Sequence, residues 1–385
     1  MVLIWYCSME ASQSTPQTLV LDFGSGVVKS GFSSGNLPSL LIPTVIGRPR
    51  RPPAIPTGSH KDIYFGQEAL DNRGDLSLIY PLNTSVTQFW DDIEDFLDFL
   101  FLEQIPNIST NTNVLIVDQP LSSRPYKEKL AQILFDEFNI QSISFQNSAL
   151  LSVLATGEMN GTVIDCGDTV TTVASIYQGM FSSTSQRRMP FAGRNVTTRL
   201  SQLLMEAGYI FSSTAEMDLV REIKEQLCYV TPNLNTSITQ LSTSSVSSRS
   251  FNLPDGSSIF LNTESFLATE PLFNPTLIGE DFTGIPQLIS ESISSCPTGV
   301  RATLSMSLLP VGGTSLLSGL NQRIEDELQK IHKNWTKITT KQPANREVLQ
   351  WIGGSIVASM HSDTIKWITK HDWLLDGASS LFTTQ

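Results

Sequence analysis

The chain has 385 residues, a length that predicts two domains or one duplicated domain with ample core. Its net charge of −12 argues against a nucleic-acid-binding surface, because affinity for phosphate requires clustered lysine and arginine. Its hydrophobic fraction of 40% is typical of a globular protein, and no stretch approaches the ~20 apolar residues of a membrane span.

The four cysteines are scattered and form no C-x-x-C pair. We therefore expect neither a disulfide framework nor a zinc site. The pattern instead favours a protein of a reducing compartment. Residues 1–17 begin with a short apolar run that no basic residue precedes, which predicts an N-terminal extension and fits a signal peptide poorly.

Strands and helices alternate along the chain, which predicts an α/β fold. Apolar runs predict strands at 19–23, 114–117, 162–166, 170–177 and 306–311. Helical spacing predicts helices over 126–138, over 320–331 and after Ser213, which forms a capping box with Glu216.

Three polar or proline-rich segments are predicted as surface insertions. Residues 48–60 contain too many prolines for a helix or a central strand, and the Ser/Thr-rich segment 236–250 is predicted to be a loop. Residues 333–346 are polar and lack periodicity.

An internal repeat marks the two halves of the chain. Residues 22–27 and 165–170 share the pattern D-x-G-x-x-V, and each follows an apolar strand. The glycines allow backbone N–H groups to approach an anion, and Asp22 and Asp165 could hold a hydrated divalent cation between the halves. A third strand that runs into Gly312-Gly313-Thr314 strengthens the prediction of a duplicated phosphate site.

Further segments occur in a characteristic order. They are Leu-Asp-Phe-Gly-Ser-Gly-Val-Val-Lys-Ser-Gly-Phe at 21–32, Ile46-Gly-Arg-Pro-Arg50, Arg73-Gly74, Trp90-Asp91-Asp92, Ala192-Gly193-Arg194, Lys224-Glu225, Leu253-Pro-Asp-Gly256, Val311-Gly-Gly-Thr314 and Trp351-Ile-Gly-Gly-Ser355. Their order and spacing resemble those of the actin family over about residues 18–385. The chain looks like a divergent actin-related protein.

The resemblance implies an α/β, duplicated ribonuclease-H-like ATPase fold with two lobes and four subdomains around a nucleotide cleft. The first lobe would span 18–155, with an outer subdomain at about 44–80, and would be completed by 349–385. The second lobe would span 156–348, with an outer subdomain at about 192–280.

The resemblance also implies a site for ATP or ADP with Mg²⁺. Residues carried over to the nucleotide are Gly24, Ser25, Gly26, Val27, Lys29, Gly167, Asp168, Thr169, Val170, Gly193, Lys224, Glu225, Gly312, Gly313, Thr314 and Leu316. Asp22 and Asp165 would order the waters of the metal ion.

Several positions depart from the family's pattern. Ser148 and Thr172 stand where actin places the glutamine and histidine that orient the attacking water, which predicts weak or absent hydrolysis, since phosphoryl transfer depends on positioning. Gln146 and Asn147 lie nearby, but a two-residue shift on a helix turns a side chain by ~200°. Thr169 replaces a glycine: either its Cβ crowds the anion or its hydroxyl adds a hydrogen bond. Glu347 replaces a lysine beside the adenine.

Two surfaces bear on assembly. Three prolines in residues 52–56 stiffen the loop that in actin inserts into a neighbouring subunit. At the opposite end, an apolar partner cleft is expected from Leu154, Ala155, Met159, Met180, Val357 and Met360. These features favour an accessory or terminal subunit over a bulk filament former.

Three functions remain open at this point, whereas a fourth, a kinase of the same superfamily, is disfavoured because no sugar-binding pattern supports it. The first is a structural subunit of a cytoplasmic, cytoskeletal assembly such as the dynactin filament or its pointed end, with actin, other actin-related subunits and complex-specific proteins as partners and no direct contact with nucleic acid or membrane. The second is a nuclear subunit of a chromatin-remodelling complex. The third is a polymerising, ATP-hydrolysing actin, which Ser148 and Thr172 disfavour.

Overall fold

A computed structural model describes residues 17–51, 61–82, 90–105, 108, 112–243, 249–253, 256–335, 337–360 and 365–382. Residues 1–16 of the predicted extension and the prolines of 52–56 lie outside the described residues. Within the described part of the chain, no helix is long and apolar enough to cross a membrane. Cys166, Cys228 and Cys296 are buried free thiols.

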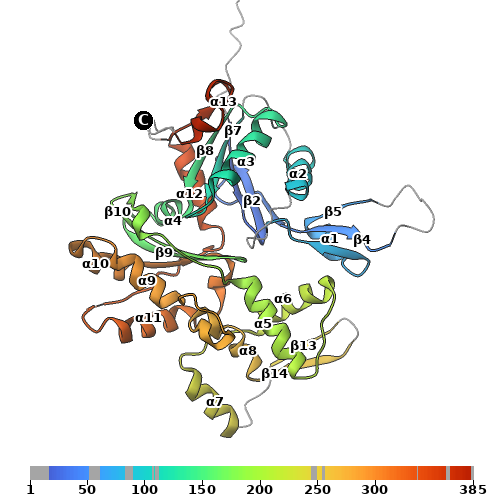
Figure 1. The fold of residues 1–385 in the computed structure, drawn as a ribbon, viewed down its shortest axis with the longest axis vertical. Coiled ribbons are helices and arrows are strands. Elements are labelled where there is room, and N and C mark those ends of the chain that lie inside the picture. Colours follow the sequence, from blue (N-terminus) through green and yellow to red (C-terminus); the bar gives the residue numbers. More distant parts are fainter. Residues whose placement is uncertain are drawn as a thin grey trace, which may run out of the picture.

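A six-stranded sheet forms the first lobe, in the order β16-β8-β7-β1-β2-β3 (Figure 1). Its strands are β1 (Gln17–Phe23), β2 (Val27–Phe32), β3 (Leu40–Pro43), β7 (Thr112–Asp118), β8 (Ser142–Asn147) and β16 (Ile368–Thr369). The strands predicted at 19–23 and 114–117 are confirmed. β1 runs antiparallel to β2 and parallel to β7.

A second sheet has the order β11-β10-β9-β15, with β12 paired to β10. Its strands are β9 (Gly161–Cys166), β10 (Thr171–Tyr177), β11 (Met180–Phe181), β12 (Arg187–Met189) and β15 (Leu308–Val311). β9 runs antiparallel to β10 and parallel to β15, which is the relation of β1 to β2 and β7.

The two D-x-G-x-x-V segments form hairpins with the same register. Asp22 lies opposite Lys29 in one hairpin, and Asp165 lies opposite Thr172 in the other. Lys29 and Thr172 therefore occupy equivalent positions in the two halves.

Both faces of the first sheet are covered by helices because its central strand is apolar on both sides. Leu19 and Leu21 join a core with Phe96 of α2, whereas Val20 joins a second core with Leu151 and Trp351. The covering elements are α2 (Trp90–Asp98), η1 (Phe99–Gln104), α3 (Arg124–Asp136), α4 (Ser148–Ala155), α12 (Leu349–Ser359), α13 (Lys370–Asp376) and η6 (Gly377–Leu381).

Close packing of α4 against α12 requires a glycine. A Cβ at Gly353 would lie 2.0 Å from the Leu151 carbonyl oxygen, so any side chain there would separate the two helices. The Trp351 indole Nε1 donates to the Val20 carbonyl at 3.1 Å and fastens α12 to the sheet.

The largest core lies in the second lobe, below the second sheet in Figure 1. The helical elements of the second lobe are η2 (Ser183–Ser185), α5 (Gly193–Glu206), α6 (Thr214–Leu227), α7 (Leu234–Thr243), α8 (Glu264–Leu267), η3 (Glu270–Leu272), η4 (Pro275–Ile278), α9 (Ile285–Ser294), α10 (Thr298–Ser305), η5 (Gly313–Leu316) and α11 (Leu320–Ile331). A hairpin of β13 (Arg249–Asn252) and β14 (Ser258–Leu261) lies beside α6.

The prediction of a continuous loop over 236–250 is wrong. Residues 234–243 form α7, and the Asn233 side chain accepts a hydrogen bond from the Thr236 backbone N–H at 3.1 Å. Asparagine at this position satisfies a free N–H of the first turn, which offsets the weak helix propensity of serine and threonine.

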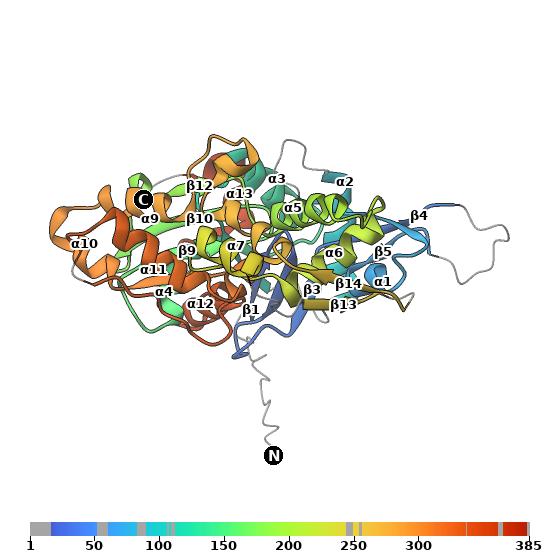
Figure 2. The same cartoon turned by 90° about the horizontal axis from the view of Figure 1, so that it is seen from below.

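A small outer sheet projects from the first lobe and faces α6 (Figure 1). It contains β4 (Ile46–Pro49), β5 (Tyr64–Phe65) and β6 (Leu76–Ile79), with α1 (Gly66–Asp71) packed on it. Seen from below, the molecule is flat, with the outer sheet at one end and α10 at the other (Figure 2).

Candidate functional site

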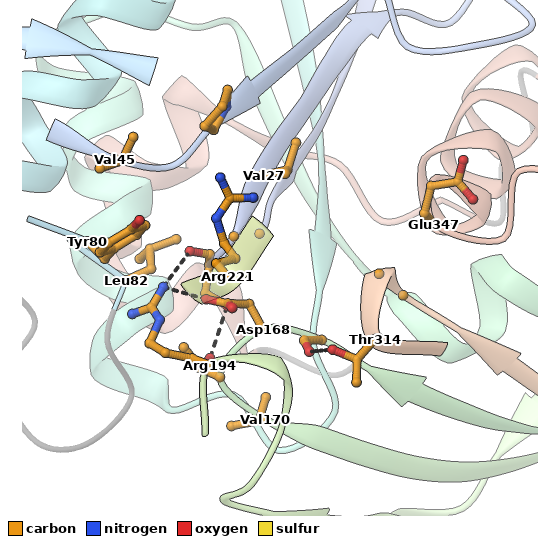
Figure 3. Close-up of a pocket in the computed structure, with 18 of the residues that line it drawn as sticks. Val27, Val45, Tyr80, Leu82, Asp168, Val170, Arg194, Arg221, Thr314 and Glu347 are labelled. Carbon is orange, nitrogen blue, oxygen red and sulfur yellow. Dashed lines mark hydrogen bonds and ion pairs between the residues drawn. The ribbon is translucent and has the colours of Figure 1, made fainter. Parts of the chain in front are cut away.

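A cleft of about 1690 Å³ separates the two lobes, and both sheets contribute strand ends to its lining. This exceeds the ~300–1,000 Å³ of an ordinary ligand pocket, so a ligand of nucleotide size would occupy only part of it. Figure 3 shows that side chains from both lobes converge on this space.

The turn from β1 to β2 forms the first wall. A Cβ at Gly24 would lie 2.6 Å from the Val27 carbonyl oxygen, so this tight turn excludes a side chain there. The Thr44 hydroxyl donates to the Gly24 carbonyl at 2.7 Å, and the Lys29 ammonium pairs with Asp22 at 2.8 Å.

The turn from β9 to β10, in the second lobe, also lines the cleft. The Gly167 N–H donates to the Val170 carbonyl at 3.1 Å and closes the turn. The Arg194 guanidinium pairs with Asp168, and the Arg194 backbone N–H also donates to the Asp168 carbonyl at 2.7 Å. Figure 3 shows both side chains in the cleft.

A third loop follows β15. Gly312 has φ +83°, and a Cβ there would lie 2.5 Å from the Cys166 carbonyl oxygen, so only glycine fits. A Cβ at Gly313 would meet no heavy atom within 4 Å, and Gly313 lines the cleft. Bare backbone therefore faces the cavity here, as close approach to a phosphate or sugar requires.

Two carboxylates lie at the floor of the cleft. Asp165 is buried, and the Gln350 amide nitrogen donates to it at 2.7 Å. Burial raises the pKa of Asp165 to about 6, and the charge of Asp22 acts in the same direction. Within the described residues, no group of three or more His, Cys, Asp or Glu side chains could hold a metal ion directly. The two aspartates suit a cation bound through water.

Helix α6 lines the far end of the cleft. Lys224 is buried, its ammonium donates to the Gly193 carbonyl at 3.1 Å, and burial lowers its pKa. Glu225 accepts from Arg221 at 3.2 Å. Glu347 also lines the cleft, so carboxylates stand on two sides of this end.

The structure brings together nearly all of the residues predicted to bind nucleotide or metal. Those that line the cleft are Asp22, Gly24, Ser25, Gly26, Val27, Lys29, Asp165, Gly167, Asp168, Thr169, Val170, Lys224, Glu225, Gly312, Gly313, Thr314 and Leu316. Gly193 lies behind this lining, where a Cβ would come within 2.5 Å of the Thr314 hydroxyl.

The two degenerate catalytic positions do not contribute to the cleft lining. Thr172 and Ser148 are both buried, and the Ser148 hydroxyl has no hydrogen-bond partner among the described residues. The expectation that Gln146 lies on a helix is wrong: it lies on β8 and donates to the Ser144 hydroxyl at 2.8 Å. Asn147 caps α4, where its side chain accepts from the Ala149 and Leu150 N–H groups.

The residues of the expected partner cleft lie on or just after α4, on β11 and at the end of α12. Met159, Met180 and Met360 are each at least half exposed, whereas Leu154, Ala155 and Val357 are partly buried. The Gly179 N–H donates to the Met159 carbonyl at 2.9 Å, which holds Met159 near the β10–β11 turn. The use of this surface stays a prediction.

Sequence reasoning missed the contacts that cross the cleft. Arg73 from the outer-sheet side pairs with Asp218 of α6 at 2.6 Å, and Tyr80 lies under the Arg194 guanidinium at 4.5 Å from the ring centroid. Gln350 was missed as well. Arg73 and Arg194 stand in motifs that were recognised, but nothing local in the sequence indicates their partners.

Comparison with known proteins adds one finding. A model of the actin family matches residues 13–382, which is nearly the whole chain. The predicted actin-like α/β fold is therefore confirmed. Proteins of this family generally bind ATP or ADP with a divalent metal ion.

Proposed function

The chain belongs to the actin family, and we propose that it is a structural subunit of a multiprotein assembly in which bound nucleotide clamps the two lobes together, with weak or no hydrolysis. The assembly we favour is cytoplasmic and cytoskeletal, a dynactin-type filament of actin-related subunits or its pointed end.

One observation carries this proposal: the parts that would hold a nucleotide share one cleft, whereas the positions that would orient water do not line it. The glycine turns at 24–26 and 167–170 come from different lobes, and both line the cavity. Ser148 and Thr172 are buried behind the lining.

The residues fit a Mg²⁺-nucleotide. Backbone N–H groups of the glycine turns and the Lys29 ammonium would bind phosphate oxygens, and Asp22 and Asp165 would accept from metal-bound waters. Bound Mg²⁺ would supply positive charge that offsets the phosphates. With Mg²⁺ and phosphate bound, Lys29 would no longer pair with Asp22 alone.

Turnover requires a side chain that orients water for in-line attack. Thr172 lies opposite Asp165 on β10, and its short buried hydroxyl reaches less far than a histidine ring. Ser148 begins α4 and is fully buried. Neither position offers what hydrolysis needs, which supports retention of nucleotide without turnover.

Exposed methionines on β11 and at the end of α12 support a role in assembly. Met180 is 67% exposed and Met360 is 68% exposed. Flexible apolar side chains of this kind suit a groove that receives a partner's apolar segment.

Affinity purification of the full-length chain from its own cells tests the proposal. We expect co-purifying actin-related and dynactin subunits, together with one tightly bound adenine nucleotide per chain. Recovery of chromatin-remodelling subunits, or of protein free of nucleotide, would contradict it.

A further inference from the structure

The two glycine turns contact each other directly through side chains. The Thr169 hydroxyl of the second lobe donates to the Ser25 hydroxyl of the first lobe at 3.0 Å. Thr169 is only 6% exposed, so this hydrogen bond is shielded from water on the Thr169 side. It joins the lobes at the two turns that would hold phosphate.

A second contact fixes the backbone of the same serine. The Arg194 guanidinium donates to the Ser25 carbonyl at 3.2 Å while it pairs with Asp168. A Cβ at Gly26 would lie 3.0 Å from the Asp168 Cβ, so the turns are already in close contact. Ser25 is thus held by the second lobe at both its hydroxyl and its carbonyl.

The direction of the hydroxyl contact matters for ligand binding. Because Thr169 is the donor, Ser25 accepts and keeps its own O–H for donation. Accepting a hydrogen bond polarises that O–H and strengthens its donation to an anion in the cleft. The Thr169 hydroxyl does make a hydrogen bond, and its acceptor is Ser25. Crowding of the anion by the Thr169 Cβ stays a prediction.

We propose that Thr169 is a positioning residue for nucleotide retention: it orients the Ser25 hydroxyl toward the phosphates and keeps the two turns together. The inference rests on the proposed nucleotide-binding function and identifies the contact that slows nucleotide release. The ligand class is a nucleoside di- or triphosphate.

The dissociation rate of a fluorescent ADP or ATP analogue, bound with Mg²⁺ and chased with unlabelled nucleotide, tests this inference. Thr169→Val keeps the side-chain shape and removes the hydroxyl, so we expect release roughly 5- to 10-fold faster than from wild type. Thr169→Ser keeps the hydroxyl and should restore release to within about twofold of wild type, because only the methyl group is lost.

Thr231→Val serves as the matched control. Thr231 is also buried, but its hydroxyl bonds to Ser237 inside the second lobe, so its loss should leave the release rate unchanged. Thermal unfolding of each nucleotide-free variant separates a folding defect from a change in release. If Thr169→Val does not fold, Thr169→Ala takes its place.

A double-mutant cycle tests whether Thr169 acts through Ser25. The Ser25→Ala/Thr169→Val pair should release nucleotide as fast as Ser25→Ala alone. Additive effects, or a Thr169→Ser protein as fast as Thr169→Val, would overturn the inference while the proposed function stands. Wild-type protein that binds no nucleotide would instead refute the proposed function.

Discussion

Arg73 donates to the buried carboxylate of Asp218 at 2.6 Å and so joins the outer-sheet side of the first lobe to α6 of the second. Glu222 accepts from the same guanidinium nitrogen at 2.5 Å, and the Tyr80 hydroxyl donates to Asp218 at 3.4 Å. The Leu78 N–H donates to the Thr214 hydroxyl at 3.0 Å. A polar network around Asp218 and the Leu78–Thr214 hydrogen bond therefore join the two lobes at the lining of the cleft.

Removal of Arg73 should weaken this connection between the lobes. Because the pair is only partly exposed and charge-assisted, we expect Arg73→Ala to release nucleotide roughly 3- to 10-fold faster, with a smaller difference at high salt. Stopped-flow chase of a fluorescent nucleotide measures the rate. Lys61→Ala breaks an exposed pair with Glu68 within the outer subdomain and should change nothing; equal rates for Arg73→Ala and wild type at low salt would refute this role of the network.

Asp165 should make the nucleotide-free protein less stable as the pH rises. Its pKa is raised from 3.8 to about 6 in the folded chain, so folding favours the protonated carboxyl. The stability it contributes is full below pH 3.8 and is lost as the pH rises through about 6. The loss amounts to at most about 3 kcal/mol.

Asp165→Asn removes this titration and preserves an oxygen that can accept from Gln350. The Tm of the variant minus that of wild type, measured without nucleotide or Mg²⁺, should grow between pH 4 and pH 7. Because both proteins contain the same other carboxylates, the effect of their titration cancels in this difference. A difference that stays flat across this range would contradict a raised pKa.

The capping box of α6 supports the cleft, since α6 supplies Asp218, Lys224 and Glu225. The Ser213 hydroxyl accepts from the Glu216 N–H at 3.2 Å, and the Glu216 carboxylate accepts from the Ser213 N–H at 2.7 Å. Ser213→Ala should cost about 1 kcal/mol in urea unfolding, whereas Ser213→Thr keeps the acceptor and should cost less. Equal losses would mean that the cap does not stabilise α6.

A buried ion pair holds the second lobe together away from the cleft. The Arg323 guanidinium pairs with Glu270 at 2.8 Å, and both side chains are less than a tenth exposed. Arg323→Met leaves a buried charge unpaired and should cost about 3–5 kcal/mol.

Arg323→Met combined with Glu270→Gln removes that charge and should recover part of the loss. Urea unfolding measures both variants. A double variant less stable than the single one would show that the penalty does not arise from the unpaired Glu270.

Much of the architecture could be predicted because it depends on local patterns. The apolar run of β1 and the turn at Gly24 follow from residues adjacent in sequence, as does the capping box at Ser213. The repeated D-x-G-x-x-V pattern located both turns that face the cleft, and the shared hairpin register explains why the two halves look alike.

Other features depend on residues that are far apart in sequence. Gln350 reaches Asp165 across 185 residues, and Arg73 reaches Asp218 across 145 residues, so neither pair leaves a local signal. Helix α7 was missed because its Ser/Thr-rich composition suggested a loop. Asn233, whose side chain accepts from the Thr236 N–H, is the residue that could have indicated the start of a helix. Gln146 was misplaced because β8 continues to Asn147.

The central claim is that the chain retains nucleotide without hydrolysing it. The most direct test follows phosphate release from purified protein loaded with Mg²⁺-ATP, beside an actin measured under the same conditions, with bound nucleotide quantified at each time. We expect ATP to stay bound and intact over times in which the actin sample completes its turnover. Phosphate release at the rate of the actin sample would contradict the account.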